Sequence, residues 1–384
     1  MQPMNVGDYR ELARRRLPRG VFEYIDRGTE DEIALGDLRQ SLDRIKFSPK
    51  VCVDVREIDL SSEVLGRSLR LPIIVAPTAL AGLLWHEGEL ELAKSAHSAG
   101  MPFCVSTMSL SSIEDIYIGA PEADLWFQLY VWRNRQLTLA LLDRVKRAGV
   151  QTLVVTVDTP ASPKKEWNDR NGFGLPMVPS LRACVDLASH PRWLWSVLIR
   201  GLLVKGLPAY AHYPAELGID VSMQSTDDLR LSDRLSWEEI RDLRRQWPGK
   251  FVIKGILRVD DAEKAYQCGA DGIVVSSHGG RNLDSSISPI SALPHIADSL
   301  DHRLTIIADS GIRRGSDIAK YLANGASAVM VGRAFLYGIA ARGGHGAQEI
   351  VEILKDELTR TLAFVGEPCI RNLSRQHLAK NSHQ

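Results

Sequence analysis

The chain of 384 residues is poor in cysteine, has no excess of charge of either sign and contains no long uninterrupted apolar run. Its five cysteines are odd in number and form no CxxC pair, which argues against a disulfide framework or a zinc site. The 47 basic residues balance the 47 acidic ones, so net charge gives no reason to expect nucleic-acid binding. The N-terminus, MQPMNVGDYRELARRRLPRG, lacks the apolar core of a signal peptide. We therefore expect a cytoplasmic protein.

Short runs rich in Val, Ile and Leu, each ending in polar or small residues, recur along the chain. Such near-continuous apolar runs are typical of parallel strands covered on both faces. Helical patterns lie between most of them, and four of these patterns reach a C-terminal glycine just before the next run. Alternating strands and helices predict an α/β fold, a (β/α)₈ TIM barrel. The eight runs are residues 71–78, 102–107, 125–131, 152–158, 251–256, 272–278, 304–310 and 328–333, and the glycines are Gly100, Gly149, Gly269 and Gly325.

A doubly wound open sheet is the alternative architecture, because counting strands does not prove that a barrel closes. No GxGxxG follows the first strand, which weakens a dinucleotide-binding interpretation. We expect one domain over residues 1–384, with a long insertion at residues 159–234 after the fourth strand.

The insertion contains RWLWSVLIRGLLVKGLPAY, in which Arg200 and Lys205 interrupt an apolar segment with two tryptophans. This segment is too short and too charged to span a bilayer. Three alternatives remain: it lies in a membrane interface, it packs against another subunit, or it simply folds onto the barrel. As a whole, the insertion is a candidate lid, subunit interface or membrane-contact segment.

The stretch DGIVVSSHGGRNLD runs from a strand into a polar turn that holds His278 and Arg281. The strand ends of a barrel share one face, which carries the active site. His278 can take a proton near neutral pH, and Asp158 at another strand end can hold its tautomer. No second His or Cys lies at ligand spacing nearby, so we expect no metal. A turn whose histidine only caps a neighbouring group is the structural alternative.

Two further tasks fall to the same rim. After strands seven and eight, DSGIRRGSD and VGRAF combine glycines with arginines, which is typical of a phosphate site. Arg281 beside His278 can bind a substrate anion, with Tyr24 and Tyr130 donating hydrogen bonds. Lys254 ends a strand and would stabilise negative charge on a cofactor. Each of these side chains has a structural alternative as an ion pair or a packed ring.

These motifs resemble those of the FMN-dependent α-hydroxy acid oxidase and dehydrogenase family. SSHGGRNLD is similar to that family's signature SNHGGRQLD, and the likeness extends over roughly residues 5–365. The mandelate-oxidising members look most similar, for example at DLWFQLYV and LYGIAARG. In a dehydrogenase of that group the insertion after strand four binds the membrane, so residues 175–215 inherit this possibility. The resemblance also implies a homo-oligomer, a tetramer.

Carried over residue by residue, the resemblance implies FMN as cofactor and a 2-hydroxy acid as substrate. It implies His278 as the catalytic base, Asp158 as its partner, and further catalytic roles for Tyr130 and Lys254. The carboxylate and hydroxyl of the substrate would bind Tyr24, Tyr130, Lys165 and Arg281. FMN would bind Pro77, Thr78, Ala79, Ser106, Gln128, Thr156, Lys254 and Ser276, with its phosphate at Asp309, Gly311, Arg313, Gly332 and Arg333.

One departure from the family pattern concerns Lys165, which stands where the family has a second substrate-binding arginine, with Trp167 and Asn168 replacing the usual neighbours. Lysine keeps a charge but lacks the planar fork that matches a carboxylate. We expect oxidation of an aromatic or bulky, mandelate-like 2-hydroxy acid to the 2-oxo acid. The alternative is a specialised member that performs a tailoring oxidation or oxidative deamination, with Trp167 as a new pocket wall.

The electron acceptor, oxygen or a quinone, is left open. Ala79 stands where oxidases of the family commonly have alanine, whereas the possible membrane segment favours a dehydrogenase. A flavin-binding protein without activity would have no need of His278 and Asp158, and both are present.

Overall fold

The computed structural model describes residues 2–173, 181–214 and 226–379. Its centre is a closed barrel of eight parallel strands, in the order β10-β3-β4-β5-β6-β7-β8-β9. The closure confirms the predicted TIM barrel and excludes the open sheet. The strands are β3 (Ile73–Val75), β4 (Phe103–Ser106), β5 (Leu125–Leu129), β6 (Thr152–Thr156), β7 (Lys250–Ile256), β8 (Gly272–Val275), β9 (Thr305–Asp309) and β10 (Ala328–Val331).

The barrel interior is apolar and is covered at one end by a hairpin, β1 (Ser62–Val64) and β2 (Arg67–Leu69). Leu65 of the hairpin packs near Gly272, at the start of β8, so the hairpin lies at the N-terminal ends of the strands. The opposite end, where the strands finish in polar residues, is left for the site. The buried interior cluster is Val64, Leu65, Leu69, Ile74, Ala76, Cys104, Trp126, Val154, Val252, Val274, Ile307, Ala328 and Met330.

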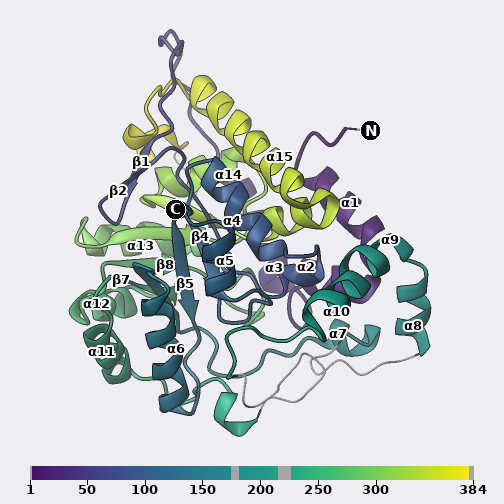
Figure 1. The fold of residues 1–384 in the computed structure, drawn as a ribbon. Helices are drawn as coiled ribbons and strands as arrows, with labels where there is room; N and C mark the ends of the chain where they lie inside the picture. Colours follow the sequence, from purple (N-terminus) through teal and green to yellow (C-terminus); the bar gives the residue numbers. More distant parts are fainter. Residues whose placement is uncertain (1, 174–180, 215–225, 380–384) are drawn as a thin grey trace.

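Helices surround the barrel, and Figure 1 places α1 beside the long α15 at its upper right. The four predicted cap glycines all adopt positive φ, and Ser236 and Glu239 form a capping box at the start of the helix that begins at Trp237. The outer helices are α4 (Gly88–Ser98), α5 (Ile113–Gly119), α6 (Arg135–Arg147), α11 (Trp237–Gln246), α12 (Val259–Gln267), α13 (Pro289–Leu300), α14 (Gly315–Ala323) and α15 (Arg333–Val365). The chain opens with α1 (Val6–Arg16), α2 (Arg19–Asp26) and α3 (Ile33–Arg44).

Between β6 and α11 the described residues form α7 (Glu166–Asn171), α8 (Leu181–Ala188), α9 (Pro191–Trp193), a π-helical turn (Leu194–Ile199) and α10 (Arg200–Lys205). The inner face of α9 and of the π-helical turn packs on the body of the protein: Trp193 and Val197 are buried, and the Trp193 indole donates to the Leu83 carbonyl (2.7 Å). The outer face is apolar and exposed, with Trp195 at 66% and Leu203 at 82%.

The segment at residues 175–215 therefore both folds onto the barrel and presents an apolar outer face, although residues 175–180 and 215 lie outside the described part. In the part of the chain that the structure describes, every helix is too short or too polar to cross a membrane.

Candidate active site

A cavity of about 1030 Å³ opens at the C-terminal ends of the barrel strands. It is lined by almost all of the side chains that the sequence singles out. Two predicted residues lie behind its wall instead: Asp158 and Ser276. The predicted residues that line it are Tyr24, Pro77, Thr78, Ala79, Ser106, Gln128, Tyr130, Thr156, Lys165, Lys254, His278, Arg281, Asp309, Gly311, Arg313, Gly332 and Arg333.

His278 lies between an acid and a phenol. Its Nδ1 is 2.9 Å from Oδ1 of Asp158, and its Nε2 is 3.1 Å from the hydroxyl of Tyr130. The carboxylate accepts a hydrogen bond from Nδ1–H, which leaves Nε2 unprotonated with its lone pair toward the cavity. The backbone of His278 has a φ of 55°, a strained value for a residue with a side chain, and its N–H donates to Ser276 Oγ (3.0 Å).

Asp158 is suited to stabilise a positive imidazolium. Burial works to raise the pKa of Asp158, but the charge and hydrogen bond of His278, with the charge of Lys254, outweigh it and hold the pKa below its usual value. The Asp158 backbone is fixed because the Asn282 amide donates to its carbonyl (2.8 Å). Burial, followed by the charge of Asp158, raises the pKa of Tyr130, which therefore keeps its proton.

Lys254 is a buried cation at the end of β7. Its Nζ donates to Ser276 Oγ (2.8 Å) and lies 3.1 Å from the Asp309 carboxylate. Burial opposes the charge, but Asp309 and then Asp158 outweigh it and raise the pKa of Lys254 above its usual value. A fixed positive charge thus faces the floor of the cavity. Ser276 supports both Lys254 and His278, which explains why it does not reach the cavity itself.

Among the described residues, two buried polar groups on the cavity wall have no hydrogen-bond partner: the Gln128 amide nitrogen and the Thr156 hydroxyl. The Gln128 carbonyl oxygen is taken by Ser106 Oγ (3.1 Å), which turns the amide N–H₂ away from that contact. Unsatisfied buried polar groups cost about 1–3 kcal/mol each, so their presence points to a bound polar molecule. The Gln128 amide and the Thr156 hydroxyl would help to hold the polar edge of a flavin, with Lys254 supplying a positive charge.

The other end of the cavity is built for an anion. Arg333 is buried against the carbonyls of Ile25 and Arg27, and burial followed by the charge of Arg281 lowers the pKa of Arg333 to about 9. No carboxylate forms an ion pair with Arg333 or Arg313 within the described ranges. Two arginines beside Gly311 and Gly332, without a direct ion pair in the described part of the chain, fit the phosphate of FMN.

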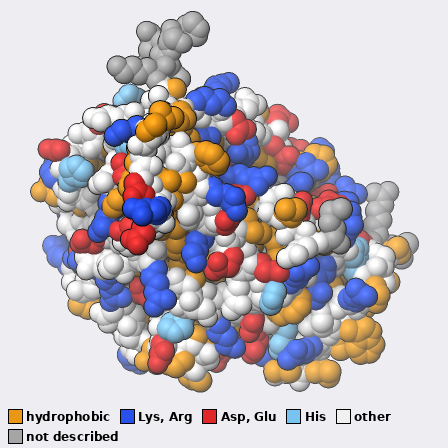
Figure 2. Space-filling view, turned by 90° about the horizontal axis from the view of Figure 1, so that it is seen from above, with side chains coloured by type: hydrophobic (Ala, Val, Ile, Leu, Met, Phe, Trp, Pro, Cys, Tyr) orange, Lys and Arg blue, Asp and Glu red, His pale blue; other side chains and the backbone are white. Residues whose placement is uncertain are grey.

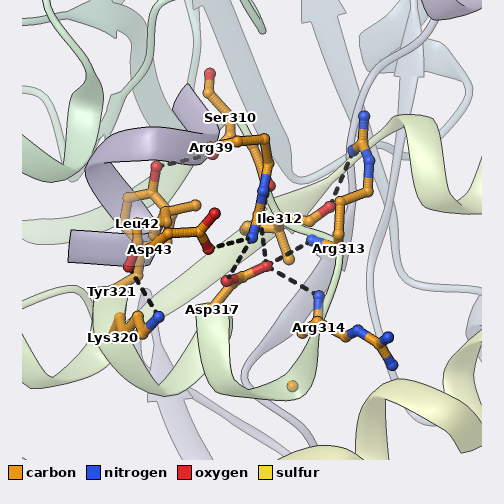
Figure 3. A network of polar contacts seen from close by, with 12 residues as sticks. Arg39, Leu42, Asp43, Ser310, Ile312, Arg313, Arg314, Asp317, Lys320 and Tyr321 are labelled. Carbon is orange, nitrogen blue, oxygen red and sulfur yellow. Dashed lines mark hydrogen bonds and ion pairs between the residues drawn. The ribbon is translucent and has the colours of Figure 1, made fainter. Parts of the chain in front are cut away.

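The turn after β9 that carries Arg313 is held by a buried carboxylate, Asp317 (Figure 3). Asp317 accepts from the backbone N–H groups of Arg313 (2.9 Å) and Arg314 (3.0 Å). Arg39 from α3 donates to Asp317 (2.6 Å) and to the Gly311 carbonyl (2.6 Å). An arginine far away in sequence thus sets the shape of the expected phosphate loop.

Tyr24 reaches the cavity although its helix lies outside the barrel. The reason is that Arg281 donates to the carbonyls of Tyr24 (2.7 Å) and Arg27 (3.0 Å), at the C-terminal end of α2. Cations are favourable at a helix C-terminus, where backbone carbonyls lack partners. The Tyr24 ring has Arg281 at 5.2 Å and Lys165 at 5.5 Å from its centre.

The suggestion that Trp167 forms a new pocket wall is wrong. Its ring is stacked between Arg27 (4.2 Å) and Arg170 (5.3 Å), outside the cavity lining. Lys165, two residues earlier, precedes α7 and does face the cavity, as does Asn168.

Sequence reasoning missed a pair of tyrosines on the returning end of the insertion. Tyr210 and Tyr213 line the cavity with ring centres 4.8 Å apart, and Tyr213 packs edge-on against Trp132. The segment is fixed to the barrel because buried His212 accepts from the Ile113 N–H (2.9 Å). The repeated aromatic spacing in YAHY was the one available signal, and no barrel pattern connected it to the mouth.

Comparison with known proteins agrees with this site. The family model described as FMN-dependent dehydrogenase matches residues 13–380. A putative L-lactate dehydrogenase of Mycobacterium tuberculosis is 38% identical over 98% of this chain and 89% of its own. The (S)-mandelate dehydrogenase of Pseudomonas putida is 40% identical over 97% of this chain and 93% of its own.

A solved structure gives the same result in three dimensions. The crystal structure of the monotopic membrane protein (S)-mandelate dehydrogenase superimposes with a TM-score of 0.94 at 39% identity, covering 99% of this chain and 100% of that one. The chain therefore belongs to the FMN-dependent dehydrogenase family, and it is an FMN-dependent oxidoreductase.

Proposed function

We propose that this enzyme oxidises a 2-hydroxy acid with an aromatic side chain to the corresponding 2-oxo acid. The observation that carries the proposal is the position of His278, which is held by Asp158 on one side and faces the cavity beside Tyr130 on the other. A base of this kind, next to unpaired cations, suits removal of a proton from a bound hydroxy acid. Bound FMN supplies the acceptor for two electrons.

In this mechanism the protein holds the substrate at its carboxylate and moves one proton. Arg281 and Lys165 attract the carboxylate, and the Tyr24 ring lies next to both cations. Tyr130 donates a hydrogen bond to the substrate hydroxyl, and His278 Nε2 receives the proton that the hydroxy acid loses. Asp158 then stabilises the imidazolium through Nδ1, which lowers the barrier for the step.

The preference for an aromatic side chain rests on the remaining wall. Tyr210, Tyr213, Met108 and Leu229 line the cavity on the side of the insertion. Aromatic rings prefer offset or edge-on neighbours at about 4.5–7 Å, and these tyrosines offer such faces. Relatives of the chain are named as lactate and as mandelate dehydrogenases, so the wall is the feature that supports an aryl substrate.

The test is an anaerobic mixing experiment with the flavin-loaded enzyme. (S)-Mandelate should bleach the flavin band rapidly, and L-lactate should do so with a kcat/KM at least tenfold lower. Bleaching by lactate alone would refute the aromatic preference, and no bleaching by either acid would refute the proposed reaction. Admitting air afterwards tells an oxidase, which recolours fast, from a dehydrogenase that needs a quinone.

A second candidate, favoured by Lys165, is oxidation of a substrate without an ordinary carboxylate, by a tailoring oxidation or oxidative deamination. It predicts bleaching by a 2-hydroxy amide or a 2-amino acid in preference to mandelate. The same anaerobic assay, run with those compounds, decides between the two.

We further propose that the outer face of residues 191–207 touches a membrane surface. Trp195, Leu203, Val204 and Leu207 are exposed there, near the basic Arg200. Hydrophobic side chains gather at the lower right of Figure 2, on the side where Figure 1 places α8 to α10. An apolar face with basic residues nearby suits a surface of anionic lipids.

Flotation with phosphatidylserine-containing vesicles tests this contact. The double variant Trp195→Ser, Leu203→Ser should lose vesicle binding, whereas Val51→Ser, at an exposed apolar residue elsewhere, should keep it. Equal vesicle binding by the wild type, the double variant and Val51→Ser would refute the proposal. The division into a single domain with an insertion at residues 159–234 stays a prediction. The homo-oligomer, a tetramer, also stays a prediction, and light scattering tests this oligomeric state.

A further inference from the structure

Two cations share one aromatic ring at the entrance of the site. Lys165 Nζ and the Arg281 guanidinium lie 5.5 and 5.2 Å from the centre of the Tyr24 ring. Neither forms an ion pair with a carboxylate among residues 2–173, 181–214 and 226–379. Each charge therefore disfavours the other until an anion enters between them.

The two cations respond differently to this crowding. Arg281 donates to two backbone carbonyls and, as a guanidinium, remains charged at any physiological pH. Lys165 makes no hydrogen bond through Nζ to a described residue, and burial followed by the charge of Arg281 lowers the pKa of Lys165 to about 7. The ionisable side chains that line the same cavity are Tyr24, Tyr130, Arg133, Lys164, Asp169, Tyr210, Tyr213, Arg230, Asp233, Lys254, His278, Arg281, Asp309, Arg313 and Arg333, with Asp158 behind His278.

We propose that Lys165 is the proton-accepting half of the carboxylate clamp, so that a substrate carboxylate entering the site draws a proton from water onto its Nζ. The inference rests on the proposed function, since it assumes that this cavity binds the carboxylate of a 2-hydroxy acid. The lone pair of the amine forms one N–H bond with a proton that leaves a hydronium ion or buffer acid in the solvent, and the resulting ammonium pairs with the carboxylate; no bond of the substrate changes. An arginine at this position would bring its charge permanently and would take up no proton.

The proposal predicts how carboxylate affinity changes with pH. Below about pH 7 the amine of the free enzyme is already an ammonium, so the Kd of a carboxylate ligand does not depend on Lys165 ionisation. Above pH 7 a proton must be added, and the Kd rises about tenfold per pH unit. The rise levels off at about ten- to a hundredfold, which is the loss expected when a charge-assisted hydrogen bond becomes a neutral one.

The experiment titrates the flavin-loaded enzyme with phenylacetate, a carboxylate that has no hydroxyl to oxidise, and follows the flavin absorbance from pH 6 to 9.5. Three proteins are compared: wild type, Lys165→Arg, and Lys164→Arg as control. Lys164 also lines the cavity, but its side chain is exposed and pairs with Glu166 (2.7 Å), and arginine at this position keeps the charge of that pair. Dividing the Kd of wild type by that of Lys165→Arg at each pH removes the common contribution of His278.

The expected ratio is constant below pH 7 and rises by at least tenfold by pH 9, while Lys164→Arg follows wild type. A ratio that stays constant over the whole range overturns the proposal. Where Lys165→Arg binds no flavin, Lys165→Met serves instead: it should bind phenylacetate with the weak affinity that wild type reaches at pH 9, and wild-type affinity in this variant at pH 6 would overturn the proposal. Flavin bleaching by (S)-mandelate at pH 6 is measured alongside, because its failure refutes the proposed function and not the clamp.

Discussion

Replacement of Asp158 by asparagine should slow oxidation by about two orders of magnitude without loss of FMN. Asp158 Oδ1 lies 2.9 Å from His278 Nδ1, so the carboxylate and the imidazolium that forms have charge centres about 4 Å apart. At an effective dielectric constant of about 20 this attraction is worth about 4 kcal/mol. The asparagine amide oxygen still accepts the Nδ1–H, which retains about 1 kcal/mol.

The remaining loss of about 3 kcal/mol corresponds to a fall of about 150-fold in the rate of flavin reduction. The assay is anaerobic stopped-flow bleaching at saturating (S)-mandelate. Because Asp158 does not line the cavity, the visible spectrum of the bound flavin should be unchanged. Thr159→Val is the control that leaves every charge in place: it removes the hydrogen bonds that Thr159 Oγ1 donates to Asp158 (3.2 Å) and accepts from the Asn282 amide (2.9 Å), and it should cost tenfold or less. A fall below tenfold in Asp158→Asn, with flavin bound, would refute the charge argument.

Three more predictions concern the cofactor and the fold. Arg39→Met should weaken FMN binding at least tenfold in a fluorescence titration, because it removes the hydrogen bonds of Arg39 to Asp317 and to the Gly311 carbonyl, which hold the expected phosphate loop. Arg44→Met, on the exposed side of the same helix, should leave FMN affinity unchanged. Equal FMN affinities of the two variants would contradict the role of Arg39 in shaping the loop. Thr156→Val removes an unsatisfied buried hydroxyl, so the apoprotein should gain about 1 kcal/mol in denaturant unfolding while FMN affinity falls about fivefold; loss of stability would contradict this. Burial opposes the charge of Asp26, but the hydrogen bond from Arg10 (2.6 Å) outweighs it and lowers the pKa of Asp26. The ionised Asp26 therefore stabilises the fold above about pH 4, the pKa of an aspartate in the unfolded chain, and this stabilisation is lost as the pH falls through the lower pKa of the folded state. The Tm gap between wild type and Asp26→Asn should therefore narrow from pH 6 to pH 2, and a constant gap would argue against it.

Most of the barrel could be predicted because its strands are covered on both faces. That environment leaves an apolar run with a polar end, such as GIVVSSH, and the polar end marks the face of the site. Closure was expected from the number of strands but not proved by it, because it depends on the pairing of β10 with β3, residues more than two hundred positions apart. The chemistry of His278 and Lys254 was visible for the same reason, since both end a strand.

The rest of the site comes from segments outside the barrel, where position along the chain says little about position in space. Tyr24 lies before the first barrel strand in the sequence, and its placement in the site depends on backbone carbonyls held by Arg281. Tyr210 was missed because it returns to the mouth after a long insertion. Trp167 was misjudged because its position two residues after Lys165 says nothing about where its ring lies. The ring packs against Arg27 and Arg170 instead of facing the cavity.

The helix that carries Tyr24 is held on the barrel by hydrogen bonds from arginines at the cavity mouth. The site therefore has two layers, the strand ends of the barrel and the segments added around the mouth. The strand ends hold the groups to which we assign proton transfer and charge stabilisation, and changes there should slow turnover. The additions around the mouth, which are α2, the segment of Lys165 and the strip with Tyr210, line the part of the cavity to which we assign the choice of substrate. Mutation in the second layer leaves the first intact, so substrate range can diverge among descendants while the redox chemistry is inherited unchanged.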